Sequence, residues 1–202
     1  MKPVLRNFQF AAIAAENYMR RAGLLHAARF EESYIRNVIR TDDGGPIRVS
    51  NIPIGPVART LIGTDAAMVA GTVYCVEINL PRSMTVTGIA VLNGTTVGTD
   101  NLIVALFGPE GGFLASSALA GTLSAGADVF QEIALTVPFV LKNDGRYWVG
   151  VQCNGTTAAT QRLAAAGYLN LAGSIAGTFG TLPDIVPPTT FTADMGPVVY
   201  LY

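Results

Sequence analysis

The sequence of 202 residues predicts a mainly β protein, an antiparallel β-sandwich preceded by an N-terminal α-helical arm. Short apolar or alternating runs follow one another from about residue 64 onward, separated by turn-forming sequences such as Asn143-Asp144-Gly145. A proline-containing stretch stands before these runs, and an Ala-, Leu- and Arg-rich stretch stands before that. The expected divisions are an arm over 1–42, an extended linker over 43–63 and a sandwich domain over 64–202.

Residues 7–40 are expected to be helical because they contain no proline and are rich in strong helix formers. Apolar residues recur at roughly helical spacing, and Gly23 is a candidate break between two helices. Glu31 and Glu32 fall where a coiled-coil seam requires apolar groups. We therefore expect one or two helices that dock on a neighbour. The linker that follows contains Pro46, Pro53 and Pro56, which favour extended backbone in the residues before them.

Seven or eight strands are expected after the linker. The run from Val69 to Leu80 alternates, with Tyr74, Val76 and Ile78 on one face and Cys75 and Glu77 on the other. Residues 167–190 are expected to form a long Gly-, Pro- and Thr-rich excursion. The strands are predicted at 69–80, 84–92, 101–107, 113–116, 129–139 (interrupted or ended by Pro138), 146–153, 161–166 and 196–202.

The composition favours a protein that associates with others. Charged residues make up 13% of the chain, about half of the ~25% found in typical soluble domains. Much of the surface must therefore be neutral, and charge repulsion opposes association only weakly. Residues 1–50 carry eight basic and five acidic residues, whereas the rest carries five and nine. A basic interaction arm is the simple interpretation. Nucleic-acid binding is disfavoured, because Glu31 and Glu32 interrupt the basic face and no aromatic stacking platform accompanies it.

No segment has the ~20 apolar residues required to span a bilayer, so no membrane partner is expected. Glu16, Arg20 and Arg21 interrupt any secretory signal pattern near the start of the sequence. We therefore expect a protein that is made in the cytoplasm and remains there or leaves inside an assembly.

The residue inventory argues against catalysis and against a bound cofactor. The only histidine, His26, lies in the arm, which removes most histidine-dependent triads and metal sites. Cys75 and Cys153 are expected on opposite faces of their strands, with Cys75 partly exposed and Cys153 buried. That geometry disfavours a bridge between them, although an intermolecular disulfide stays open. No cysteine or histidine spacing typical of a metal site is present.

The acidic residues give only a weak hydrolase hypothesis. Glu77 and Glu132 lie on predicted strands and could face each other across a groove, but solvent-facing glutamates are far commoner. Most of the aspartates stand in or beside turns, where their carboxylates cap the backbone. The sequons at Asn93 and Asn154 are better explained as hairpin turns. We therefore predict that the protein is not an enzyme.

Aromatic residues are the remaining candidates for a ligand or interface site. Trp148 alternates away from its apolar neighbours, so it faces either a second layer or a binding surface together with the segment 167–190. Core packing is the favoured alternative, because aromatic side chains dominate sandwich cores. The candidate residues are Trp148, Tyr168, Tyr200 and Tyr202.

The stretch 64–166 resembles a jelly-roll module of tailed-bacteriophage virion proteins. The similar phrases are GTDAAMVAGTVYCVEINLPRSMTVTGIAVLNG, DNLIVALFGPEGGFLASSA, ADVFQEIALTVPFVL, DGRYWVGVQCNGTT and the closing TTFTADMGPVVYLY. The resemblance implies a jelly-roll-like β-sandwich that forms homotrimers as a capsid decoration (cement) or head-fibre protein. It implies major capsid or tail proteins as partners, and it carries over no site residues. A tail-fibre or receptor-reading module that binds a host glycan is the alternative.

Overall fold

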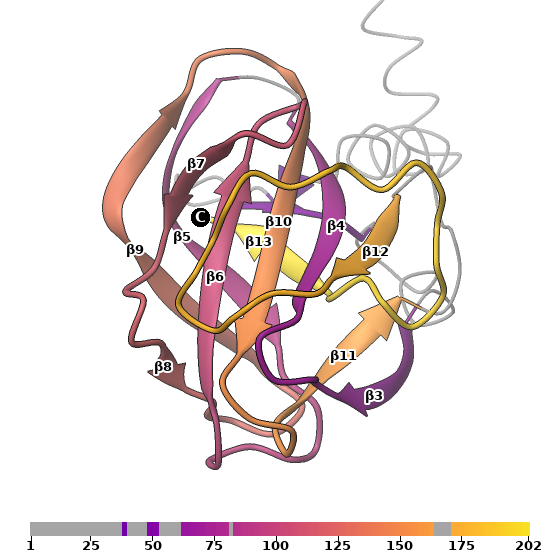
Figure 1. The fold of residues 1–202 in the computed structure, drawn as a ribbon. Coiled ribbons are helices and arrows are strands. Elements are labelled where there is room, and N and C mark those ends of the chain that lie inside the picture. Colours follow the sequence, from indigo (N-terminus) through magenta and orange to yellow (C-terminus); the bar gives the residue numbers. More distant parts are fainter. Residues whose placement is uncertain (1–37, 40–47, 53–61, 81–82, 164–170) are drawn as a thin grey trace, which may run out of the picture.

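The computed structural model describes residues 38–39, 48–52, 62–80, 83–163 and 171–202 (Figure 1). Every helix or strand element in these ranges is a strand. Residues 7–37 and 40 of the helix predicted over 7–40, and the candidate Tyr168, lie outside the described residues. At the end of that predicted helix the prediction is wrong, because Val38–Ile39 form strand β1 and pair with β2. Both residues are β-branched, which suits a strand better than a helix.

Two antiparallel sheets form a sandwich-like body, with β5, β9 and β13 behind β4, β6 and β10 in Figure 1. The first sheet contains, in spatial order, β1 (Val38–Ile39), β2 (Arg48–Ser50), β13 (Val199–Leu201), β5 (Met84–Leu92) and β9 (Phe130–Leu141). The second contains β12 (Ala172–Ile175), β4 (Val73–Leu80), β10 (Gly145–Cys153), β6 (Asn101–Phe107) and β7 (Phe113–Ser116), with β8 (Thr122–Leu123) paired to β6. A separate pair joins β3 (Ile62–Ala67) to β11 (Ala159–Leu163).

The main core lies between the two sheets and follows from the two-residue period of each strand. Alternate residues of every central strand point inward, so that both sheets contribute to one buried cluster. From the first sheet these residues include Val49, Val86, Ile89, Val91, Ile133, Val199 and Leu201. From the second they include Tyr74, Val76, Ile78, Leu102, Val104, Leu106, Val149, Val151 and Cys153. Burial of this apolar surface is the main driving force for the fold.

Most strands of the body were predicted from the sequence, and the bounds of β5, β6 and β7 are the expected ones. Three strands of the body were missed, β3, β8 and β12, the last of them inside the expected excursion over 167–190. Residues 48–50, in the stretch expected to be an extended linker, form β2 and pair with β13. Asn51 beside them donates to the carbonyl of Pro197 and accepts from the amide of Val199.

Strand β9 runs through Pro138 to Leu141, past the expected end at residue 139, but its pairing with β5 is interrupted just before Phe139. Its pairing with β5 shifts between Gly88–Ala134 and Val86–Phe139. Thr87 alone therefore faces four residues of β9, Leu135 to Pro138. Proline lacks the amide hydrogen that a ladder requires, and bulges at sheet edges are where strands accommodate it. The bulge bends β9 at the free edge of the first sheet.

The segment after β12 covers the outer face of the second sheet, where it passes in front of β10 and β6 (Figure 1). Leu182 and Ile185 of this cover pack on Trp148 and its neighbours in a second buried cluster. Gly111 permits the close approach, since a side chain there would collide with the carbonyl of Ile185, and its φ of 87° favours glycine. We refer to residues 171–191 as the cover segment.

Candidate interaction surfaces

The sequence-predicted site at Trp148 is part of the interior. The Trp148 side chain is fully buried under the cover segment, together with Phe107 and Ile185. Its indole Nε1 donates to the carbonyl of Pro109 at 3.2 Å. Because no part of the ring reaches solvent, a sugar cannot stack on it in this structure. Trp148 is therefore packed in the interior, as the favoured alternative predicted. It belongs to the second buried cluster and not to the main core between the sheets.

Polar residues of the same sheet face hold the cover segment in place. The buried Gln152 donates to the carbonyls of Gly71 and Thr178, at 2.7 and 3.0 Å, and accepts from the amide of Gly180 at 3.1 Å. Glu77 accepts from the amide of Leu171 at 3.0 Å. Each contact supplies a partner for a buried or partly buried backbone group. This face of the protein is structural.

The pairing of Glu77 with Glu132 across a groove is contradicted. Glu77 shares the outer face of the second sheet with Cys75, whereas Glu132 precedes the inward-facing Ile133 on the first sheet. The two carboxylates therefore point away from opposite sides of the sandwich. Paired acid–base chemistry needs carboxylates within roughly 5 to 9.5 Å of each other.

Both cysteines are free and buried. Cys153 lies in the main core as expected, but the expectation of a partly exposed Cys75 is wrong, because the cover segment lies over it. Burial raises the pKa of the Cys75 thiol to about 12 and also raises that of Cys153. The thiolate is the reactive form, so neither residue suits nucleophilic chemistry.

Buried polar groups elsewhere join segments of the chain together. Arg162 lies 3.8 Å from the ring centroid of Tyr74 and donates from Nη1 to the carbonyl of Met195 at 3.0 Å. Burial lowers the pKa of Arg162 to about 10.

Asn93 is fully buried, and its Nδ2 donates to the carbonyl of Ala125. The sequon at Asn93 is therefore closed to modification in the folded protein. These contacts fix loops to the sheets.

The outer face of the first sheet carries an aromatic cluster that includes two of the predicted residues. Tyr200 lies between Phe130, at a centroid distance of 4.8 Å, and Tyr202, at 6.3 Å. Arg48 lies over the Tyr200 ring at 5.1 Å and forms an ion pair with Glu132 at 2.8 Å. We call these five residues the aromatic cluster.

Hydrogen bonding makes Tyr200 the fixed centre of the aromatic cluster. Its hydroxyl donates to Glu132 Oε1 at 2.7 Å, and only 6% of the residue is exposed. Burial and the bond to Glu132 raise its pKa to about 12, so it stays protonated at neutral pH. Phe130 is 38% exposed and gives the cluster its accessible apolar surface. The arrangement offers a ring edge beside an exposed ion pair.

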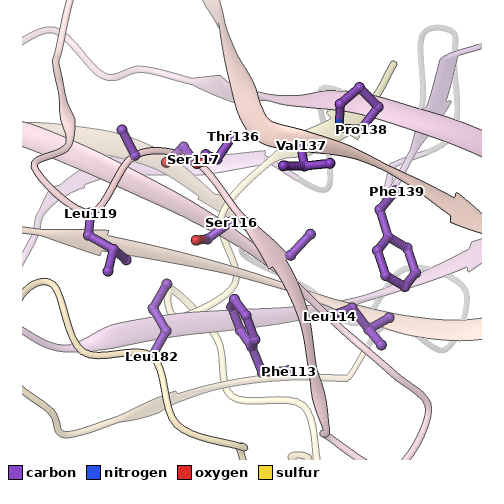
Figure 2. A pocket seen from close by; sticks show the side chains of 12 residues that line it. Phe113, Leu114, Ser116, Ser117, Leu119, Thr136, Val137, Pro138, Phe139 and Leu182 are labelled. Carbon is purple, nitrogen blue, oxygen red and sulfur yellow. The ribbon is translucent and has the colours of Figure 1, made fainter.

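A groove opens at one side of the sandwich, between the edge strands β7 and β9. Figure 2 shows Thr136, Val137, Pro138 and Phe139 of β9 along one side and Phe113, Leu114, Leu119 and Leu182 along the other. The cavity has a volume of about 710 Å³. Ala115, Ser116, Ser117 and Ala118 complete the lining. No lining residue carries a charge, and hydroxyls are the only polar side-chain groups.

Large apolar side chains are exposed at the edge groove. Val137 is 68% exposed, Leu119 52% and Phe113 41%. Contiguous apolar surface of this kind marks protein–protein contacts more often than isolated exposed residues do. Sequence reasoning missed the groove, because it arises from two strands that are adjacent only after the sheets have stacked. The run Val137-Pro138-Phe139 was the one local signal, an apolar stretch at a predicted interruption.

Among the residues that the structure describes, no group of three or more His, Cys, Asp or Glu side chains could hold a metal ion. The same ranges contain no helix long and apolar enough to cross a membrane. Comparison with known proteins adds no family: no family model matches the chain, and no curated protein matches it.

Proposed function

We propose that the protein is a structural subunit of a bacteriophage virion, a capsid decoration or head-fibre protein that is not an enzyme. In this proposal the sandwich-like body is a jelly roll that forms homotrimers, and an N-terminal helical arm attaches it to a major capsid or tail protein. The protein is made in the host cytoplasm and ends in the particle. The uncharged edge groove with its exposed apolar rim is the observation that carries the proposal.

Three further features support an assembly role. The chain has few charges, so its surface is compatible with close contact between copies. Its polar outer-face residues, Glu77 and Gln152, are used to fix the cover segment. Its thiols are buried and their pKa values are raised. Glu77, Gln152 and the two cysteines therefore contribute to the packing of the body.

Sedimentation of the purified full chain at micromolar concentration tests self-assembly. The expected result is a closed oligomer, with a trimer of the 21.2 kDa chain as the leading species. The sedimentation coefficient and the mass from light scattering should agree and stay constant over a tenfold dilution. A monodisperse monomer would overturn the proposal that the body assembles with itself.

Glycan reading by a tail-fibre module is the second candidate, and the aromatic cluster favours it. An accessible ring beside a charged pair is a common arrangement in ligand sites, because the ring supplies contact area and the polar groups fix orientation. Phe130 supplies the ring, and Arg48 and Glu132 supply the polar groups.

A glycan array with matched variants tests this second candidate. Phe130→Ala should abolish any glycan signal, whereas Phe113→Ala, which removes a similarly exposed phenylalanine at the edge groove, should leave it unchanged. Equal signals from the wild type and Phe130→Ala, or no signal at millimolar ligand, would remove the aromatic cluster as a sugar site.

A further inference from the structure

We propose that the edge groove between β7 and β9 receives a second copy of this chain, with the β9 bulge of one copy seated in the groove of the other. This inference rests on the assembly role proposed above and names the surface and the partner. The exposed residues of the bulge, Thr136 to Pro138, form the β9 side of that groove, so the inserting segment and the receiving surface adjoin on the same molecule.

The projecting element is the exposed part of the β9 bulge, Thr136 to Pro138, whereas Leu135 at the start of the same bulge is buried in the main core. The four residues of the bulge face only Thr87 on the neighbouring strand, so the bulge stands clear of the ladder. Its most exposed member is Val137, which presents 68% of its surface to solvent. An exposed valine on a bend at a sheet edge has a shape that can enter a hollow.

The receiving element is the groove itself. Phe113, Leu114, Phe139 and Leu182 give it apolar walls, and Thr136 and Ser116 supply hydroxyls. A specific interface commonly has an apolar centre inside a more polar rim. The twelve residues that line the groove are about half of the ~20–30 residues that each side of a standard interface contains. The groove therefore has the size of an interface core.

Charge makes a second copy the fitting occupant. In the proposed contact the bulge of one copy meets the groove of the other, and a charge on either surface would be buried without a partner. The groove has no charged residue in its lining. A charged partner segment would have no group of opposite charge to pair with in the groove. The β9 bulge carries no charge, so its burial in the groove leaves no charge unpaired.

The edges of the sheets indicate how the copies meet. In the described part of the chain, β7 pairs only with β6, and β9 pairs only with β5. Such free edges can add strands without limit unless something interrupts them. Pro138 and the bulge interrupt β9, so contact through side chains is favoured over continuous strand addition. Side-chain contact between a bulge and a groove gives a closed oligomer when the rotation that relates the copies closes into a ring.

Substituting the bulge with a charge tests the proposal directly. Val137→Asp should raise the dissociation constant of the oligomer at least tenfold, because the carboxylate would enter an apolar hollow without a partner. Val186→Asp is the matched control, since Val186 is 84% exposed on the cover segment and does not line the groove. Circular dichroism and thermal unfolding should show that both variants fold like the wild type.

A cross-linking experiment gives a second readout. The native cysteines are buried, so a short bismaleimide should react mainly with an introduced thiol. Val137→Cys mixed with Ser116→Cys should form cross-linked pairs, and Val186→Cys mixed with Ser116→Cys should not. A wild-type monomer would refute the assembly role itself. A wild-type oligomer that Val137→Asp leaves intact, with no Val137–Ser116 cross-link, would refute only this interface.

Discussion

Replacing Gln152 by alanine should remove hydrogen bonds that hold the cover segment and lower the free energy of unfolding substantially. The side chain contributes three hydrogen bonds, a buried one to Gly71 and partly buried ones to Thr178 and Gly180. Leaving a buried polar group unsatisfied costs about 1–3 kcal/mol. Three such groups at the low end of that range give about 3 kcal/mol, which corresponds to a fall in Tm of roughly 6–12 °C for a chain of this size.

Urea unfolding at fixed protein concentration, followed by tryptophan fluorescence, measures this change. Trp148 is the only tryptophan and lies under the cover segment, so its emission reports the cover directly. Gln161→Ala is the control, because Gln161 makes one exposed bond to Asp128 at 3.2 Å and should cost less than about 0.5 kcal/mol. If both variants unfold at the same urea concentration, the structural role assigned to Gln152 is wrong.

Three other outcomes are expected. Trp148 should emit at short wavelength and resist acrylamide quenching in the native protein, then shift to the red on unfolding, because it is fully buried. Native Cys75 and Cys153 should react with a thiol reagent only after denaturation; fast reaction of either thiol in buffer would refute their burial. Two hydrogen bonds from Thr95 lower the pKa of Asp65 from 3.8. The ionised carboxylate therefore stabilises the fold at pH values above 3.8, and this stabilisation is lost as the pH falls through the lowered pKa of the folded state. Asp65→Asn should therefore lower the urea midpoint at pH 7, and the difference from the wild type should narrow near pH 3; a constant difference would exclude this linkage.

The strands of the body could be predicted because their signals are local. Alternation in the run 73–80 separated Cys75 and Glu77 from Val76 and Ile78, and that separation is correct. The same alternation predicted that Cys75 would be partly exposed, and this was wrong. The cover segment lies nearly 100 residues further along the chain, and nothing in strand β4 indicates its presence. Periodicity assigns a face, but only the whole fold decides what lies on that face.

The candidate sites show the same division. Tyr200 and Tyr202 were proposed as interface residues from their aromatic character, and they do lie together on an outer sheet face. Their link to Arg48 and Glu132 depends on strands far apart in sequence, so it could not be predicted. Pro138 predicted an interrupted strand, but the groove beside it requires the strand order of both sheets. Long-range pairing decides features that local patterns leave open.

The central claim is that this chain is a component of a virion, and quantitative mass spectrometry of purified particles tests it most directly. If the proposal is correct, intact virus particles purified from the source of the chain should contain it at a fixed ratio to the major capsid protein, in multiples of the oligomer measured in solution. Hundreds of copies would place the protein on the head, and a few copies would place it on the tail. Its absence from washed particles, with the protein recovered only in the soluble fraction, would contradict the claim.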